Sequence, residues 1–280
     1  MRESFYTCGG SHFWEDVFFY QKWRIQRNHV TKKCRLLDNW DIRRHEGSFE
    51  ECRRAFVKYI EAYEIARQKG HMIIMLHSLG ESKNIFKPLW RRALKNDFLV
   101  AAVNYPSTQK DLASHIKQLH FFLDHLEDVH TVSFVAHGAG CAVLQGLFAK
   151  KAEWQKRLKL GRSVFVSPYI YGSKLFAKLS SNYITEFLIG PMGDDLTPEK
   201  IAKLPPLTAI ENGIVITKRP FFERFLNLVT WSWETKKTKE EIINDTKAKD
   251  LIEVKRRKWR VFKDKKLCDT LIKFLKNGSF

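Results

Sequence analysis

The sequence predicts an α/β fold in which a mostly parallel sheet is covered by helices on both faces. Two observations carry this prediction. Short continuous apolar runs, typical of strands buried on both faces, alternate with longer amphipathic segments of helical spacing. In addition, a turn of small residues joins the apolar run 132–136 directly to a helical segment. Regular alternation of strand and helix favours a parallel sheet with helices packed on either side.

Composition sets the broad class. A length of 280 residues suits one large α/β domain or two small ones, and 44% apolar content with 21 Phe can fill a core. No run reaches the length of a membrane span, and the first residues lack the apolar core of a signal peptide. The cysteines are scattered and match neither a disulfide framework nor a zinc site, so we expect reduced thiols and a cytoplasmic protein. They are Cys8, Cys34, Cys52, Cys141 and Cys268.

The net charge is +18, and the stretch 247–266 alone holds ten Lys and Arg against three acidic residues. A solvated basic face is the first interpretation. An anionic membrane surface is the second, because each basic residue near such a surface adds about 1 kcal/mol. Nucleic acid is the least favoured partner, since charge alone supports only non-specific binding. The aromatic residues after position 218 lie among these charges and fit either core packing or an interfacial membrane patch.

The elements follow in order. Residues 1–48 carry no clear period and are expected to be irregular. Ser48 and Glu51 have the spacing of a capping box and predict a helix over 49–69, stopped by Gly70. Beyond it, the predicted strands are 72–76, 98–104, 132–136, 163–167 and 213–217. The predicted helices are 86–95, 111–126, 141–151 and 265–276.

The stretch Ala136-His137-Gly138-Ala139-Gly140 has the layout of a nucleophile elbow, the sharp strand-to-helix turn that presents a catalytic serine. Gly138 occupies the nucleophile's place. Glycine has no side chain and cannot attack a carbonyl. The sequence therefore predicts the turn without its nucleophile, and glycine there also relieves backbone strain.

These residues resemble the lipase/esterase branch of the α/β-hydrolase superfamily. The run 72–80 resembles a strand followed by the His-Gly-Leu-Gly oxyanion loop, with Ser78 where glycine is usual. The run 132–141 resembles the family's elbow. The resemblance is to a small bacterial lipase-like group and covers roughly residues 50–280. It implies an α/β-hydrolase-like domain over 49–280 preceded by an N-terminal extension over 1–48. The further matching segments are 98–107, 190–196, 213–217 and 274–280.

The resemblance also implies where a catalytic triad would lie: the serine at Gly138, the acid at Leu228 and the histidine at Lys258. None of these three residues can perform the catalytic role of its position in the triad. The loss of the base does not depend on alignment, because the fold needs its histidine after the serine and the acid. None of the ten histidines follows His137. We therefore expect no catalytic residue.

Possible substitutes each have a simpler interpretation. Cys141 fits a buried thiol, Ser78 a turn or cap, and His137 packing or a backbone hydrogen bond. Lys258 fits a solvated charge. A pocket could still remain, because the backbone N–H groups of Leu79 and Ala139 are the natural oxyanion donors. Its expected residues are His77, Ser78, Leu79, His137, Ala139 and Cys141.

The sequence thus predicts a catalytically degenerate, lipase-like pseudoenzyme that acts by binding a lipid or acyl ligand, an anionic surface or a protein partner. One alternative is a weak acyl or ester hydrolase with an unidentified nucleophile. A second is a basic peripheral membrane or nucleic-acid binder. We expect no cofactor and no metal, and a location in the cytoplasm or at a membrane surface.

Overall fold

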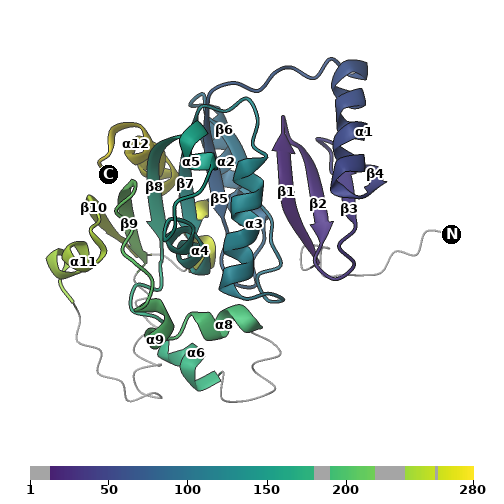
Figure 1. Cartoon of the computed structure of the whole chain (residues 1–280). Helices are drawn as coiled ribbons and strands as arrows, with labels where there is room; N and C mark the ends of the chain where they lie inside the picture. The colour runs from purple at the N-terminus through teal and green to yellow at the C-terminus, as the bar shows by residue number, and fades with distance from the viewer. Residues whose placement is uncertain (1–12, 180–189, 218–236, 256–257) are drawn as a thin grey trace.

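The computed structural model describes residues 13–179, 190–217, 237–255 and 258–280, and contains two sheets (Figure 1). The larger one has six strands in the order β10-β9-β8-β7-β5-β6, all paired in parallel. This confirms the predicted α/β architecture. The five predicted strands are present as β5 (His71–Leu76), β6 (Leu99–Val103), β7 (Thr131–His137), β8 (Lys159–Val166) and β9 (Glu211–Thr217). The sixth, β10 (Asp250–Val254), was not predicted.

Helices cover both faces of this sheet, as predicted. Alternate strand residues point to opposite sides, so Ile73 and Met75 lie in one core and Ile74 and Leu76 in the other. The first core is closed by η1 (Lys83–Phe86), α2 (Lys87–Leu94), η2 (Lys258–Lys263) and α12 (Lys265–Asn277). The second is closed by α3 (Leu112–Asp124), α4 (Ala139–Leu147) and α5 (Trp154–Arg157).

Among the described residues after β8, three short helices lie together beyond the carboxyl ends of the strands (Figure 1). They are α6 (Lys174–Leu179), α8 (Pro191–Asp195) and α9 (Pro198–Ile201). Helix α11 (Lys239–Thr246) leads into β10 at the edge of the sheet. Within the described ranges, no helix is long and apolar enough to cross a bilayer.

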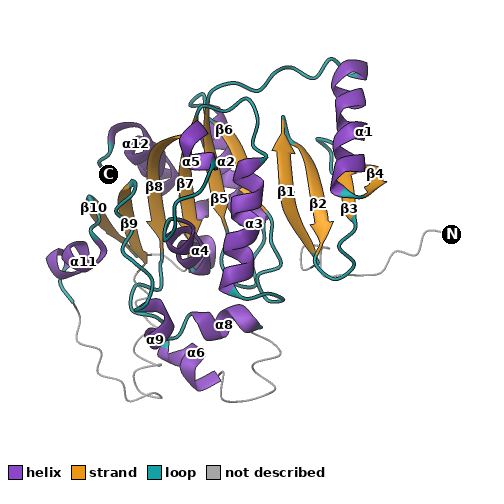
Figure 2. Ribbon diagram, in the orientation of Figure 1, coloured by secondary structure: helices purple, strands orange, loops and turns teal. Residues whose placement is uncertain are grey.

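The expectation of irregular structure over residues 1–48 was wrong from Trp14 onward. That part of the chain forms an antiparallel sheet, β1-β2-β3-β4 (Figure 2). Most of its apolar side chains are buried, and Phe18, Ile25 and Leu36 lie completely buried in a core that belongs to this sheet. The strands are short and rich in charged residues, which hid their alternation. They are β1 (Trp14–Tyr20), β2 (Trp23–Asn28), β3 (Cys34–Leu37) and β4 (Arg43–Gly47).

Helix α1 (Phe49–Ala62) begins with the predicted capping box, in which Ser48 and Glu51 each bind the other's backbone N–H. It ends at Ala62 rather than near residue 69. The helix packs on β2, β3 and β4, where Phe56 completes the small core. Helix α1 therefore belongs with the four-stranded sheet, while the division of the chain after residue 48 stays a prediction.

Two residues join the sheets. The Asp16 N–H of β1 donates to the Asn104 carbonyl at the end of β6, 2.8 Å away. The Asn104 N–H donates to Asp16 Oδ2 at 2.7 Å. Figure 1 accordingly shows the four-stranded sheet on the β6 side of the larger sheet, opposite β10.

Candidate functional site

The predicted elbow is present. Strand β7 ends at His137, Gly138 adopts φ 52° and ψ −115°, and α4 starts at Ala139, two residues earlier than predicted. The positive φ is open to glycine and strains other residues. The Gly138 N–H donates to the Val166 carbonyl at 2.9 Å, which ties the turn to the end of β8. The turn therefore lies at the carboxyl ends of the central strands.

Gly140 lets α4 approach the end of β5 closely. A Cβ on this residue would lie 2.6 Å from the Leu76 carbonyl oxygen and 2.8 Å from that of His77. Neither backbone oxygen can move away without shifting the strand. The second glycine of the elbow is therefore required by packing.

Ser78 occupies the space that a side chain at Gly138 would need. Its hydroxyl oxygen accepts a hydrogen bond from the Ala139 N–H at 3.1 Å, at the start of α4. A Cβ built on Gly138 would overlap this same hydroxyl group. Ser78 is 7% exposed. The predicted capping role of Ser78 thus takes the form of a bond to the N-terminus of α4 from the loop after β5.

Glu81 links the backbone of Ser78 to the ring of His137. Its Oε2 accepts the Ser78 N–H at 3.0 Å and lies 2.8 Å from His137 Nδ1. Burial alone would raise the pKa of Glu81, but the hydrogen bond and charge of His137 hold that pKa below its usual value. The other nitrogen of His137, Nε2, is buried and has no hydrogen-bond partner among the residues that the structure describes. The ring of His137 instead meets Phe262 edge to face, with 5.5 Å between centroids.

His77 is a packing residue. Its ring stacks on Tyr105 with 4.1 Å between centroids, and its Nδ1 lies 2.9 Å from the Ser78 carbonyl oxygen. The Tyr105 hydroxyl donates to the His77 carbonyl. Complete burial lowers the pKa of His77 to about 4. The ring is therefore neutral near pH 7.

The remaining predicted residues are not brought together into a reactive group. Cys141 is buried in α4, with its thiol 3.3 Å from the Ala136 carbonyl oxygen. Leu79 is half-buried, and its N–H binds no residue in the described part of the chain. Lys258 begins η2, where only its backbone is described. Leu228 lies outside the described residues.

Two residues of the site escaped the sequence reasoning: Glu81 and Phe262. Ser78 and Glu81 have the Ser-x-x-Glu spacing of a capping box, and that pattern could have linked them. Phe262 carried no comparable signal. The residue comes from the segment after β10, yet it packs against a residue of β7 and against Phe86.

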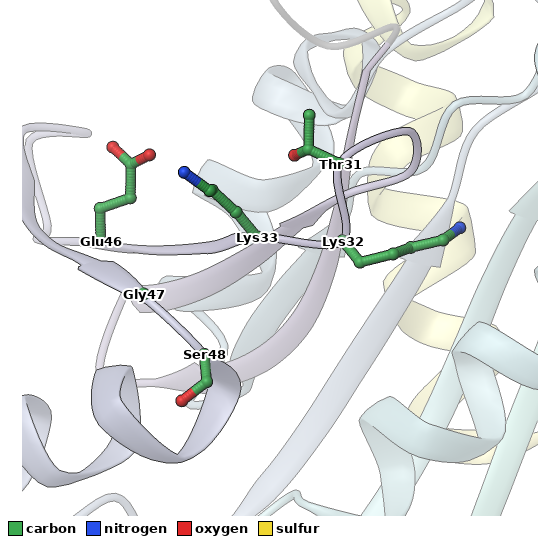
Figure 3. Close-up of a pocket in the computed structure, with 6 residues that line it drawn as sticks. All are labelled: Thr31, Lys32, Lys33, Glu46, Gly47 and Ser48. Carbon is green, nitrogen blue, oxygen red and sulfur yellow. The ribbon is translucent and has the colours of Figure 1, made fainter.

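Other candidate sites are weaker. Over the described ranges, no three His, Cys, Asp or Glu side chains gather in a way that could hold a metal ion. A shallow hollow of about 580 Å³ lies between the β2–β3 turn and the start of α1 (Figure 3). Its residues are Thr31, Lys32, Lys33, Glu46, Gly47 and Ser48. The α1 N-terminus beside it is already capped by Ser48 and Glu51, so the hollow offers no prepared anion site.

No family model and no curated protein matches the sequence. Solved structures do match the fold. A carboxylesterase of the thaumarchaeon Nitrososphaera gargenis superposes with a TM-score of 0.50 at 12% identity, over 74% of this chain and 90% of its own. The chain has an α/β-hydrolase fold.

Two further solved structures are similar to this hydrolase-fold chain, a Paleococcus ferrophilus monoacylglycerol lipase and a lipase-esterase related protein from Clostridium acetobutylicum. The lipase has 13% identity and a TM-score of 0.49, with 73% of this chain and 93% of its own covered. The Clostridium protein has 16% identity and a TM-score of 0.48, with 75% and 96% covered. Neither likeness says anything about activity, so the chemistry of this hydrolase-fold protein has to be argued from its own residues.

Proposed function

We propose that this α/β-hydrolase-fold protein does not hydrolyse esters and acts by binding. The observation that carries the proposal is Gly138 at the apex of the elbow, with the hydroxyl of Ser78 in the space that a side chain there would need. A hydrolase of this fold needs a hydroxyl on the elbow and a histidine from a later loop. This chain has neither, because its elbow carries Gly138 and no histidine follows His137.

Ser78 does not replace the lost nucleophile as it stands. A general base must lie within hydrogen-bond reach of the hydroxyl that it deprotonates. In the described part of the chain, the Ser78 hydroxyl has one hydrogen bond, from the Ala139 N–H. His137 is held by Glu81 and faces Phe262. His77 has a pKa of about 4 and is fully buried, which makes it a poor base near neutral pH.

Binding at this site would rest on its backbone donors. The Leu79 N–H and, once the Ser78 hydroxyl is displaced, the Ala139 N–H are donors for an anionic or carbonyl oxygen at the start of a helix. A medium-chain fatty acid offers such an oxygen together with an apolar tail. We therefore propose an acyl ligand with a free carboxylate, held without turnover. Isothermal titration with decanoate should detect it.

The enzymatic test uses short-chain p-nitrophenyl esters and a fluorophosphonate probe on the full chain. We expect hydrolysis no faster than with heat-denatured protein, and no labelling. The variants S78A and S107A form a matched pair, because each hydroxyl accepts one backbone N–H in the same region, from Ala139 and Gly80 respectively. Turnover or labelling that disappears in S78A and persists in S107A would establish the protein as an enzyme.

One observation favours a second candidate, an acyl hydrolase with Ser78 as its nucleophile. The Ser78 hydroxyl lies beside a helix N-terminus, and Glu81 joins the Ser78 backbone to His137, whose Nε2 has no partner in the described part of the chain. If Nδ1 of His137 carries the proton, Nε2 is free to accept one, as in a catalytic histidine. Activity by this route would require His137 to turn away from Phe262. It should then fall about 100-fold or more in E81Q as well as in S78A.

A further inference from the structure

The end of the four-stranded sheet that carries the β1–β2 and β3–β4 turns exposes large apolar side chains. Trp40 and Ile42, two residues apart in the β3–β4 turn, are 72% and 52% exposed. Tyr63, which follows the last residue of α1, is 57% exposed. Its ring centroid lies 6.2 Å from that of Trp23, the first residue of β2. We call this end of the sheet, with its exposed Trp40, Ile42 and Tyr63, the aromatic end. Isolated apolar residues are common on protein surfaces, whereas a group confined to one tip indicates contact with something apolar.

The β3–β4 turn holds its apolar side chains in a fixed arrangement. Asp38 Oδ1 accepts the N–H groups of Trp40 and Ile42, each at 2.9 Å. Asp38 Oδ2 is bound by the guanidinium of Arg44 at 2.7 Å. Asp41 forms ion pairs with Arg24 and with Lys83 of η1, which fasten the turn to the rest of the molecule. These bonds fix the backbone of the turn, from which the side chains of Trp40 and Ile42 extend into solvent.

Basic residues border the aromatic end. Arg43, the first residue of β4, has a side chain 63% exposed and forms an ion pair with Glu46, while Arg44 pairs with Asp38. Lys22 is exposed in the β1–β2 turn at the same end of the sheet. Exposed Glu61 and Glu64 lie on the side of Tyr63. The side of this end around Trp40 and Ile42 is therefore more favourable to a negative surface than the side of Tyr63, and the whole chain adds its net charge of +18.

We propose that the aromatic end docks this protein on an anionic lipid bilayer, with Trp40 and Ile42 inserted at the level of the headgroups. A turn of two large apolar side chains is a convex tip, and it offers far less than the roughly 800 Å² per partner of a stable protein interface. A bilayer needs no matching pocket. Tryptophan and basic residues are the side chains that favour the membrane interface. The proposal is independent of whether the elbow is catalytic.

The test is co-sedimentation of the full chain with vesicles of phosphatidylcholine, with and without phosphatidylserine. We expect binding only to the anionic vesicles and weaker binding as salt increases. The double variant W40S/I42S should lower the partition coefficient about tenfold or more, because it removes the two side chains that insert into the bilayer. Val30, 64% exposed in the β2–β3 turn at the opposite end of the sheet, supplies the matched control V30S, which should bind like the wild type.

Two further measurements separate the interpretations. Thermal melting of W40S/I42S should match the wild type, since both side chains are exposed in the native state. Brominated lipids should quench the tryptophan fluorescence of the wild type more than that of W40F. The proposal is overturned by unchanged binding in W40S/I42S, by an equal loss in V30S, or by no binding to anionic vesicles at low salt. Binding that depends on Trp40 but is made to a purified protein, with no binding to lipid, would overturn it as well.

Discussion

Ser78 and Gly138 share one space. The hydroxyl of Ser78 accepts the Ala139 N–H at 3.1 Å, and a Cβ on Gly138 would overlap that hydroxyl. Gly138 lies on the turn after β7, and Ser78 lies in the loop after β5. The hydroxyl at this point of the fold therefore comes from the loop, while the turn itself carries no side chain.

Restoring the serine at the elbow alone should therefore destabilise the protein. The variant G138S places a side chain at φ 52° and against Ser78, so we expect it to lose about 2 to 4 kcal/mol of unfolding free energy. The double variant S78G/G138S removes the overlap and should recover at least about 1 kcal/mol of that loss. Urea unfolding of the wild type, both single variants and the double variant measures the coupling.

The same double variant also separates two causes of inactivity. It has a serine on the elbow but still no histidine after position 137. We expect no ester hydrolysis above background. Purely additive free energies in the cycle would contradict the shared space, and hydrolysis by the double variant would show that another group supplies the base.

Glu81 should be worth more to stability than a half-buried carboxylate usually is. Its Oε2 accepts the Ser78 N–H and contacts His137 Nδ1, both in buried surroundings. E81A leaves these two polar groups without a partner and should cost about 2 to 4 kcal/mol. E81Q keeps an acceptor oxygen and should cost less. Guanidinium unfolding of both variants tests the difference, and equal effects would mean that the bonds to Glu81 contribute little.

Much of the larger sheet could be predicted from the sequence because its strands are buried on both faces. Ile73 and Met75 face one core while Ile74 and Leu76 face the other, so the whole run 72–76 is apolar. Strand β10 lies at the edge, where Glu253 is exposed and the apolar run is broken. The pattern that reveals a central strand is therefore weak there. The four-stranded sheet was missed for the same reason, since β4 reads Arg-Arg-His-Glu-Gly.

The candidate site was predictable in part. The elbow has a local signature of strand, glycine turn and helix, and that signature placed Gly138 and Gly140 correctly. The contact between Ser78 and Ala139 joins residues 61 positions apart, and the contact between His137 and Phe262 spans an even longer stretch. Such pairs depend on how the strands are ordered in the sheet. A single sequence carries no local trace of them.

Phe262 should be a major packing residue of the segment after β10. It is 1% exposed and contacts the rings of Phe86 and His137. We expect F262A to lower the unfolding free energy by about 3 to 5 kcal/mol through the cavity that it leaves, and F262L to lower it by less. Calorimetry of the two variants measures this. A loss below about 1 kcal/mol in F262A would place Phe262 outside the core of the molecule.

Acid should destabilise the protein through its buried histidines. Burial, aided by the charge of Lys110, lowers the pKa of His115 to about 4, and burial lowers that of His77 to about 4. In the unfolded chain these groups titrate near 6.5. Between about pH 6.5 and 4 the unfolded state therefore binds more protons than the folded state, and stability falls as the pH falls. Each of the two contributes a slope of about 1.4 kcal/mol per pH unit in this window.

The variant H115L isolates one part of that slope. His115 is 1% exposed, and within the described ranges neither of its ring nitrogens has a hydrogen-bond partner of good geometry, so leucine replaces two poorly satisfied polar atoms at similar volume. Near pH 7.5 we expect H115L to be about as stable as the wild type or more stable. Toward pH 4.5 its advantage should grow by about 1 kcal/mol or more for each unit below pH 6.5. His29, His71 and His120, whose pKa values burial also lowers, continue to destabilise the variant in acid. Urea unfolding across this pH range provides the measurement, and parallel stability profiles for the two proteins would show that His115 is already hydrated in the native state.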